Sequence, residues 1–229
     1  MAAADSALID LVLLKDAAMQ EVVSSLSNVS VCFNERSGYV LKNFSLECRQ
    51  GEFLVIVGRS GCGKTTVLNL LAGLVEAKDG DVRVLGKQPK DARKQIGYMF
   101  ARDALVPSRT ALKNIEIGLE VRGVATPERR RRALALISAL GLEGAEQRYP
   151  WQLSQGMRQR VALARTWALK PNLILMDEPF AALDAQTRET ARAQFLELWE
   201  RDRSSVIFVT HDLTEALLLG DRILLLGAN

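Results

Sequence analysis

The stretch GRSGCGKT, residues 58–65, decides the fold prediction, because it lies between the apolar run EFLVIVG (52–58) and the helical pattern TVLNLLAGL (66–74). A buried strand, a glycine-rich turn and a helix in this order are typical of a phosphate-binding loop. The glycines let backbone N–H groups face phosphate oxygens, Lys64 reaches the β- and γ-phosphates, and Thr65 offers an oxygen to Mg²⁺. The flanking strand and helix disfavour the alternative, a glycine-rich turn without a ligand. The predicted binding residues are Gly58, Arg59, Ser60, Gly61, Cys62, Gly63, Lys64, Thr65 and Thr66.

The apolar runs NLILM (172–176) and VIFVT (206–210) resemble EFLVIVG in length and β-branched content, and helical stretches separate them. This pattern predicts an α/β fold with a parallel sheet buried on both faces. Alternating apolar residues from Val29, followed by VLKNFSLEC (40–48), predict an antiparallel β subdomain before that core. We interpret residues 6–24 as a possible helix and assign them no function.

The block between Ala111 and Trp151 contains no strand-like run, which predicts an inserted helical subdomain over about 102–165. One helix is expected from Thr126, as N-cap, to a stop at Gly141. The predicted domains are an N-terminal extension, 1–27, and a nucleotide-binding domain, 28–229.

The net charge of the chain excludes few classes of function, because 30 lysines and arginines are nearly balanced by 27 acidic residues. The run Arg129–Arg132 could be a nucleic-acid patch, but it lies on a predicted helix where Glu128 and Arg132 have i, i+4 spacing, which favours a solvated face. Three widely spaced cysteines predict neither a disulfide framework nor a metal site. The apolar run near the N-terminus is broken by Lys15 and Asp16, so we expect neither a signal peptide nor a spanning helix there.

Two carboxylates, Asp177 and Glu178, follow the apolar run that ends at Met176. Two adjacent carboxylates at the end of a buried strand cost free energy unless a cation binds there and one of them handles a proton. Asp177 is therefore expected to hold Mg²⁺ and Glu178 to polarise a water. A helix N-cap with an acidic first turn is the alternative. His211 follows the strand that ends at Thr210, on the same predicted sheet edge, which favours a γ-phosphate contact over a structural histidine.

The stretch WQLSQGMRQRVALAR, residues 151–165, leads from a polar step into an arginine-rich helix. Ser154 is a suitable N-cap, and a capped amphipathic helix is the simpler interpretation. The helix start could nevertheless bind an anion. The phosphate-binding loop already accounts for the phosphates of a ligand bound to this chain. A second anion site therefore implies a phosphate that another molecule holds.

These motifs, in this order, resemble those of the ATPase subunits of ABC transporters over about residues 29–226. LSQGMRQR (153–160) resembles their signature motif, LILMDE (173–178) the Walker B strand, AALD (181–184) the D-loop and THD (210–212) the switch histidine. The resemblance implies ATP and Mg²⁺ as cofactors. It also implies a head-to-tail pair in which Ser154 and Gly156 of one copy cap the γ-phosphate held by the other. Asp184 of the D-loop joins the nucleotide site. Phe33 aligns with an aromatic that stacks on adenine, although a strand-core position is equally compatible.

The segments at 140–154, 176–188 and 198–216 most resemble importers of nitrate, taurine and aliphatic sulfonates. The resemblance implies a pair docked at the cytoplasmic face of the inner membrane on permease subunits, which a substrate-binding protein feeds from outside. Residues 105–123 resemble the surface that receives the permease's coupling helix. Nucleic acid is not an expected partner.

Three departures from the family pattern qualify this prediction. Ala101 stands 37 positions after Lys64, where relatives carry the Q-loop glutamine, and an alanine binds neither metal nor water. Slower or less tightly coupled hydrolysis is therefore expected. Gln155 replaces a signature glycine, and the chain ends at Asn229, where relatives commonly continue. The expected function is an ATPase that drives import. The alternatives are a soluble ABC ATPase without a permease and an ATP-binding regulatory subunit with weak hydrolysis.

Overall fold

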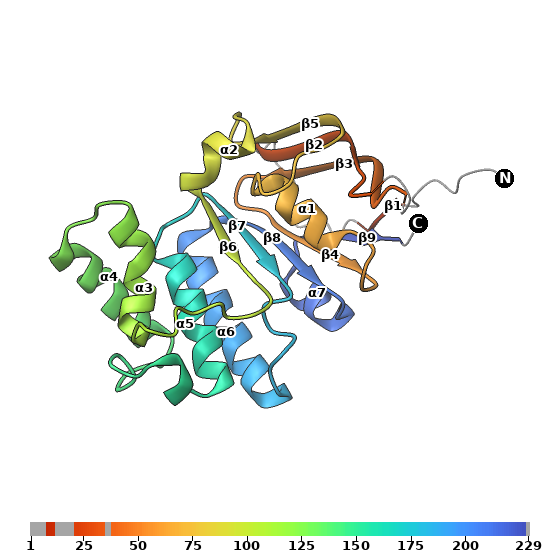
Figure 1. Ribbon diagram of the computed structural model, residues 1–229. Helices are drawn as coiled ribbons and strands as arrows, with labels where there is room; N and C mark the ends of the chain where they lie inside the picture. The colour runs from red at the N-terminus through yellow and green to blue at the C-terminus, as the bar shows by residue number, and fades with distance from the viewer. Residues whose placement is uncertain (1–7, 12–20, 35–37, 228–229) are drawn as a thin grey trace. The chain divides into compact units, whose positions relative to one another are not determined.

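The computed structural model describes residues 8–11, 21–34 and 38–227, and the chain divides into two compact units (Figure 1). The first unit contains the described residues up to Ile96, together with Asn172–Glu178 and those from Ser204 on. The second unit contains Gly97–Pro171 and Pro179–Arg203. The chain therefore passes between the units at several points, and one of them follows Glu178 directly.

The core of the first unit is the predicted parallel sheet. It contains β4 (Phe53–Gly58), β7 (Leu173–Asp177), β8 (Ser205–Thr210), β9 (Arg222–Leu226) and β1 (Leu8–Leu11) in the order β1-β9-β4-β8-β7. Strand β8 is parallel to both β4 and β7, while β1 is antiparallel to β9. Val57 pairs with Thr210 and Asp177 pairs with Val209. The carboxyl ends of these strands therefore meet at one sheet edge, as the sequence predicts.

Helix α1 (Lys64–Leu71) follows β4 and packs against β4, β7 and β8. Its apolar face, which includes Val67, Leu68 and Leu71, is buried against them. Helix α7 (Leu213–Leu219) packs on β4 and β8. The short helix α2 (Pro89–Ala92) and the 3₁₀ turn η1 (Arg93–Gln95) lead into β6 (Ile96–Met99), along which the chain enters the second unit.

A second sheet of the first unit contains β3 (Leu41–Arg49), β2 (Val22–Val31) and β5 (Asp79–Val84), all antiparallel, which run side by side in Figure 1. The predicted helix over 6–24 is wrong for the described residues, because Leu8–Leu11 and the segment from Val22 are strands. Val23, Leu26 and Val29 are buried, and register shifts in β2 let these unevenly spaced residues share the core. Strand β2 also crosses the predicted boundary between residues 27 and 28. Residues 12–20 lie outside the described part.

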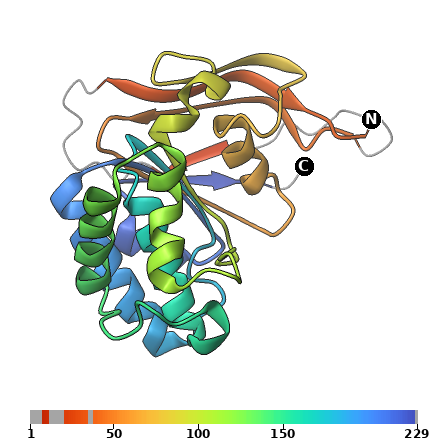
Figure 2. The same cartoon turned by 60° about the vertical axis from the view of Figure 1, so that its left-hand side comes forward.

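The second unit is helical, with α3 (Ala111–Val121), α4 (Thr126–Ala139), η2 (Pro150–Gln152), α5 (Gln155–Trp167) and α6 (Ala185–Asp202) (Figure 2). Helix α3 packs against α4 and α5, and α5 also packs against α6. Because α6 clusters with this unit, the unit extends beyond the predicted 102–165. Gly141 follows α4 with a φ of +57°, but the N-cap is Ala125 rather than Thr126.

The arginine run lies on α4, where Glu128 Oε1 accepts from Arg132 Nε at 2.6 Å and the Glu128 carboxylate also pairs with Arg131. This is the i, i+4 arrangement that the spacing predicts. Within the described residues, no helix is long and apolar enough to cross a membrane.

Candidate active site

The predicted phosphate-binding loop joins β4 to α1 and wraps around the Lys64 ammonium. Lys64 Nζ donates to the carbonyl oxygens of Gly58 at 2.8 Å and Arg59 at 3.0 Å, and Lys64 is only 5% exposed. A pocket of about 290 Å³ opens beside it, lined by Val40, Ser60, Gly61, Gly63, Lys64, Thr65, Thr66 and Glu178. The loop thus forms a concave site at the N-terminus of α1, where unpaired amides favour an anion.

Glycine is required at several loop positions for different reasons. Gly61 and Gly63 have φ values of +85° and +106°, in the left-handed region that other residues rarely adopt. Gly58 is required by space, because a Cβ there would lie 2.5 Å from the carbonyl oxygen of Leu226 on β9. Cys62 is buried, and its sulfur would lie 2.7 Å from the same Cβ. The loop backbone is therefore seated tightly on the sheet edge.

Two carboxylates at the end of β7 face this loop. Thr65 Oγ1 donates to Asp177 at 3.2 Å (Oδ1) and 3.0 Å (Oδ2), and Glu178 Oε1 lies 3.7 Å from Lys64 Nζ. Burial raises the pKa of Asp177, the Thr65 hydrogen bond lowers it, and the Glu178 charge raises it again. A partly buried carboxylate whose charge is disfavoured in this way has a physical reason to bind a cation.

The donor set suits Mg²⁺, which prefers oxygen ligands and is usually held by one or two protein groups together with phosphates and waters. Thr65 and Asp177 are an oxygen pair of this kind beside the anion pocket. Among the residues that the structure describes, no group of three or more His, Cys, Asp or Glu residues could hold a metal.

Glu178 has a strained backbone, with φ at +45°, and its N–H donates to the Val209 carbonyl oxygen at 2.9 Å. His211 Nδ1 lies 2.9 Å from Glu178 Oε2. If the imidazole is neutral, its Nδ1–H donates to this carboxylate and Nε2 is left as an acceptor. The structure therefore brings Lys64, Thr65, Asp177, Glu178 and His211 together within the first unit.

The predicted signature segment lies in the second unit. Ser154 is the N-cap of α5, as predicted, and its Oγ accepts from the Met157 N–H at 3.2 Å. A Cβ on Gly156 would lie 2.3 Å from Thr187 Cγ2 on α6, so only glycine fits there without a shift. Asp184 caps α6 by accepting from the Thr187 N–H at 3.0 Å, and this hydrogen bond lowers the pKa of Asp184.

Phe33 follows the end of β2 and is 61% exposed. The interpretation as a strand-core residue is therefore wrong, and its ring is available for stacking. The sequence analysis missed Val40, which lines the phosphate pocket. No local pattern points to Val40, since its place there results from the pairing of β2 with β3.

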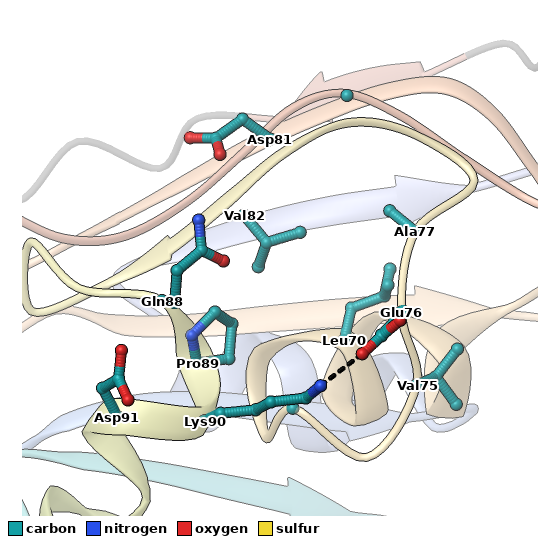
Figure 3. Close-up of a pocket in the computed structure, with 12 residues that line it drawn as sticks. Leu70, Val75, Glu76, Ala77, Asp81, Val82, Gln88, Pro89, Lys90 and Asp91 are labelled. Carbon is teal, nitrogen blue, oxygen red and sulfur yellow. Dashed lines mark hydrogen bonds and ion pairs between the residues drawn. The ribbon is translucent and has the colours of Figure 1, made fainter.

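A larger pocket of the first unit, about 510 Å³, contains none of the predicted site residues. Figure 3 shows its lining from the end of α1, from β5 and from α2, with an apolar wall of Leu70, Val75, Ala77, Val82 and Pro89. An exposed ion pair between Lys90 and Glu76 crosses it. It contains no buried charge or polar cluster that would act on a substrate, so the smaller pocket is the better candidate site.

Comparison with known protein families identifies the family of this chain. The family described as ABC transporter matches residues 41–181, more than half of the chain. The chain belongs to this family.

Similar ABC transporter proteins include an uncharacterized ATP-binding protein of Methanocaldococcus jannaschii, 47% identical over 86% of this chain and 73% of that protein. The taurine import ATP-binding protein TauB of Escherichia coli K12 is 42% identical over 82% of this chain and 74% of TauB. A solved dimeric ATP-binding cassette in a post-hydrolysis state with ADP and Pi superposes with a TM-score of 0.80, at 35% identity, over 90% of this chain and 96% of that one. A dimeric bacterial ABC transporter cassette gives 0.79 at 36% identity, over 89% and 94%.

Membership of the ABC transporter family confirms the predicted fold class, a P-loop NTPase core with an antiparallel subdomain and a helical subdomain. The chain is an ABC transporter ATP-binding subunit of the ABC ATPase family. Ala101, which the sequence analysis expects at the Q-loop position, is exposed in the segment that follows β6.

Proposed function

We propose that this chain is the ATP-hydrolysing subunit of an ABC importer, which couples hydrolysis to the membrane transport of a small anionic solute such as nitrate, taurine or an alkanesulfonate. One observation carries the hydrolytic part of the proposal. An ammonium, a hydroxyl, two carboxylates and an imidazole meet beside an anion pocket, with Glu178 3.7 Å from Lys64 and 2.9 Å from His211. The similarity to TauB supports the importer part.

In this proposal the loop amides and Lys64 bind the β- and γ-phosphates, and Thr65 and Asp177 hold Mg²⁺. When bound, Mg²⁺ neutralises charge on the phosphate oxygens. Glu178 accepts a hydrogen bond from the attacking water, which orients its oxygen in line with the γ-phosphorus. The new P–O bond forms as the bond from the γ-phosphorus to the β–γ bridging oxygen breaks, which yields ADP and phosphate. His211 holds the Glu178 carboxylate and contacts the γ-phosphate.

A second copy completes the proposed site. Ser154 and Gly156 stand at the start of α5, a helix of 13 residues whose first amides have no carbonyl partner within the helix. Both similar solved cassettes are described as dimeric, one with ADP and Pi bound. The proposed partners are a second copy, transmembrane permease subunits at the cytoplasmic face of the membrane and, indirectly, an external substrate-binding protein. The proposed nucleotide site also includes Phe33 and Asp184.

The variant Glu178→Gln tests the catalytic role. The amide keeps the shape but is a much poorer acceptor for the water proton, so hydrolysis should fall by about 10²–10⁴-fold. ATP binding should persist, and ATP should shift the protein to a closed dimer in light scattering. Glu76→Gln, which removes an exposed carboxylate outside the phosphate pocket, is the matched control. Hydrolysis by Glu178→Gln at the unmodified rate would remove Glu178 from this role.

The transported solute is tested in the complex. Membrane subunits that copurify with the chain are reconstituted in vesicles, and hydrolysis is measured with nitrate, taurine, an alkanesulfonate and a cationic amino acid. Stimulation by nitrate, taurine or the alkanesulfonate supports the proposal. Stimulation by the cation alone, or copurification with no membrane subunit, contradicts the importer assignment.

Ala101 favours a second candidate, an ATP-binding regulatory subunit that hydrolyses little. Its methyl group provides no ligand for Mg²⁺ or water. Hydrolysis that stays at the background rate both with and without the membrane subunits, while ATP still binds, would select this candidate. Restoration of the glutamine by Ala101→Gln should then raise the rate.

A further inference from the structure

Helix α5 connects two segments of the second unit that are far apart in sequence, and it does so through polar side chains that the proposed chemistry leaves unused. Arg158 and Arg165 reach the segment just after Ala101. Gln159 reaches Pro179, which follows Glu178 in the chain. All of these residues except Glu178 belong to the second unit.

The contacts to the first segment involve both side chain and backbone. Arg158 Nε donates to Asp103 Oδ2 at 3.0 Å, and both groups are about one-third exposed. Arg165 donates to the Ala104 carbonyl oxygen at 2.7 Å and to the Asp103 carbonyl oxygen at 2.8 Å. Burial lowers the pKa of Arg165, but a guanidinium keeps its charge. Ala104 has a φ of +44°, a conformation that costs an alanine free energy, so the arginine contacts hold the segment in a shape that it would not adopt alone.

The contact to the second segment is buried. Gln159 is 6% exposed, and its amide nitrogen donates to the Pro179 carbonyl oxygen. Pro179 has no N–H, so its carbonyl is the only backbone hydrogen-bonding group that it offers. The preceding residue, Glu178, has the left-handed backbone described above. The hydrogen bond from Gln159 therefore fixes the chain directly after the residue that carries the proposed catalytic carboxylate.

We propose that α5 links the segment at Asp103 and Ala104 to Pro179, with Gln159 as a positioning residue for Glu178. The inference rests on the proposed function, because it uses the catalytic role of Glu178. Arg158, Gln159 and Arg165 stand on one stiff helix, so a displacement of the 103–104 segment turns or shifts α5 and changes the position of Pro179. This link connects the segment that follows Ala101 to the backbone next to Glu178. The methyl side chain of Ala101 cannot make such a connection.

Hydrogen exchange tests the link without any need for hydrolysis. Gln159→Leu removes the donor, and Arg165→Met removes the two hydrogen bonds from Arg165 to the carbonyl oxygens of Asp103 and Ala104. Each should speed amide exchange in residues 178–183 by about tenfold or more, the equivalent of about one buried hydrogen bond. Arg160→Met is the matched control, since Arg160 also donates from α5 to two backbone carbonyl oxygens, those of Leu140 and Gly141, at the start of another loop.

Arg160→Met should leave exchange in residues 178–183 unchanged. The inference is overturned if Arg165→Met also leaves that segment unchanged, or if Arg160→Met speeds exchange as much. In both cases α5 would contribute general stability rather than a directed link.

Kinetics separate positioning from stability. In Gln159→Leu, kcat per bound nucleotide should fall about tenfold while KM for ATP stays within about twofold, because the altered hydrogen bond is outside the nucleotide pocket. Gln159→His, whose ring N–H can donate to the same carbonyl, should recover part of the rate. A loss of folded protein with unchanged kcat per bound nucleotide would show a structural role only. Absence of hydrolysis in the unmodified protein would overturn the proposed function, while the exchange measurement would still decide the link.

Discussion

Gly156→Ala is the perturbation that separates two reasons for a glycine in the signature segment. One reason is internal, because the added Cβ would lie 2.3 Å from Thr187 Cγ2. The other is proposed, the approach of a phosphate held by a second copy. Thr187→Ser removes the clashing methyl group and keeps the hydroxyl, so the two reasons can be tested independently.

The structure sets the size of the internal effect. Two carbon atoms prefer a separation of about 3.5–4.0 Å, so a contact at 2.3 Å forces a local shift that costs roughly 1–3 kcal/mol. Alanine in place of glycine in a helix recovers up to about 1 kcal/mol. Gly156→Ala should thus lower the free energy of unfolding by about 0–3 kcal/mol. In the double variant the nearest atom of residue 187 is its Cβ at 3.7 Å, an ordinary contact, so the double variant should be at least as stable as the unmodified protein.

The assay measures denaturant unfolding, ATP-dependent dimer formation and hydrolysis for both single variants and the double variant. If Gly156 faces a phosphate of the second copy, the double variant regains stability but stays at least about tenfold slower and dimerises poorly with ATP. The reasoning is refuted if Thr187→Ser restores both stability and the full hydrolysis rate to Gly156→Ala. Gly156 would then serve packing against α6 alone.

Three further predictions concern single sites. Asp177→Asn should stabilise the nucleotide-free protein and abolish the Mg²⁺-dependent part of its stabilisation by ATP. The pKa of Asp177 is raised in the folded state, so its charge destabilises the fold above that pKa, and this cost is relieved as the pH falls through it. Melting temperatures measured from about pH 7 to about pH 4 should show the relief. The variant Asp177→Asn should not show it. Gly58→Ala should lower the unfolding free energy by about 1–3 kcal/mol and weaken ATP binding in calorimetry, because its Cβ meets the rigid Leu226 carbonyl oxygen; unchanged binding would contradict the tight seating of the loop. Hydrogen bonds from the adjacent arginines lower the pKa of Glu128 to about 2, so an NMR titration should find its midpoint there, and the stability from this ion pair should be lost only as the pH falls from about 4.5 towards 2.

The parallel core and the motif residues on it were predictable from the sequence, because each depends on local pattern. EFLVIVG, NLILM and VIFVT are continuous apolar runs, and their carboxyl ends must lie at one edge in a parallel sheet. Residues that follow those runs, Lys64, Asp177 and His211, therefore come together whatever the details of packing. The glycines of the loop were predictable for the same reason, since their spacing is the signal.

The rest depended on contacts between distant segments. The apolar residues at 22–31 have irregular spacing, which reads poorly as a strand until the bulges in β2 place them on one face. Val40 enters the phosphate pocket only through the pairing of β2 with β3. The clustering of α6 with the helical unit results from its packing against α5, and no composition change marks it. The N-cap of α4 was predicted one residue too late for a local reason, because Ala125 has no polar side chain that could signal the cap.

The arrangement of the two carboxylates in the candidate site costs free energy when no ligand is bound. Asp177 carries a disfavoured charge beside a second carboxylate, and Glu178 keeps a left-handed backbone that costs about 1–2 kcal/mol. Lys64 and Thr65 offset part of this through their contacts to Glu178 and Asp177, and in the proposed mechanism the same two groups turn to phosphate and cation when ATP binds. In that mechanism, ATP binding replaces the contacts that Asp177 and Glu178 make to these two residues. Because Pro179 follows Glu178 directly, a relaxation of that strained residue would displace the residue with which the chain enters the helical unit.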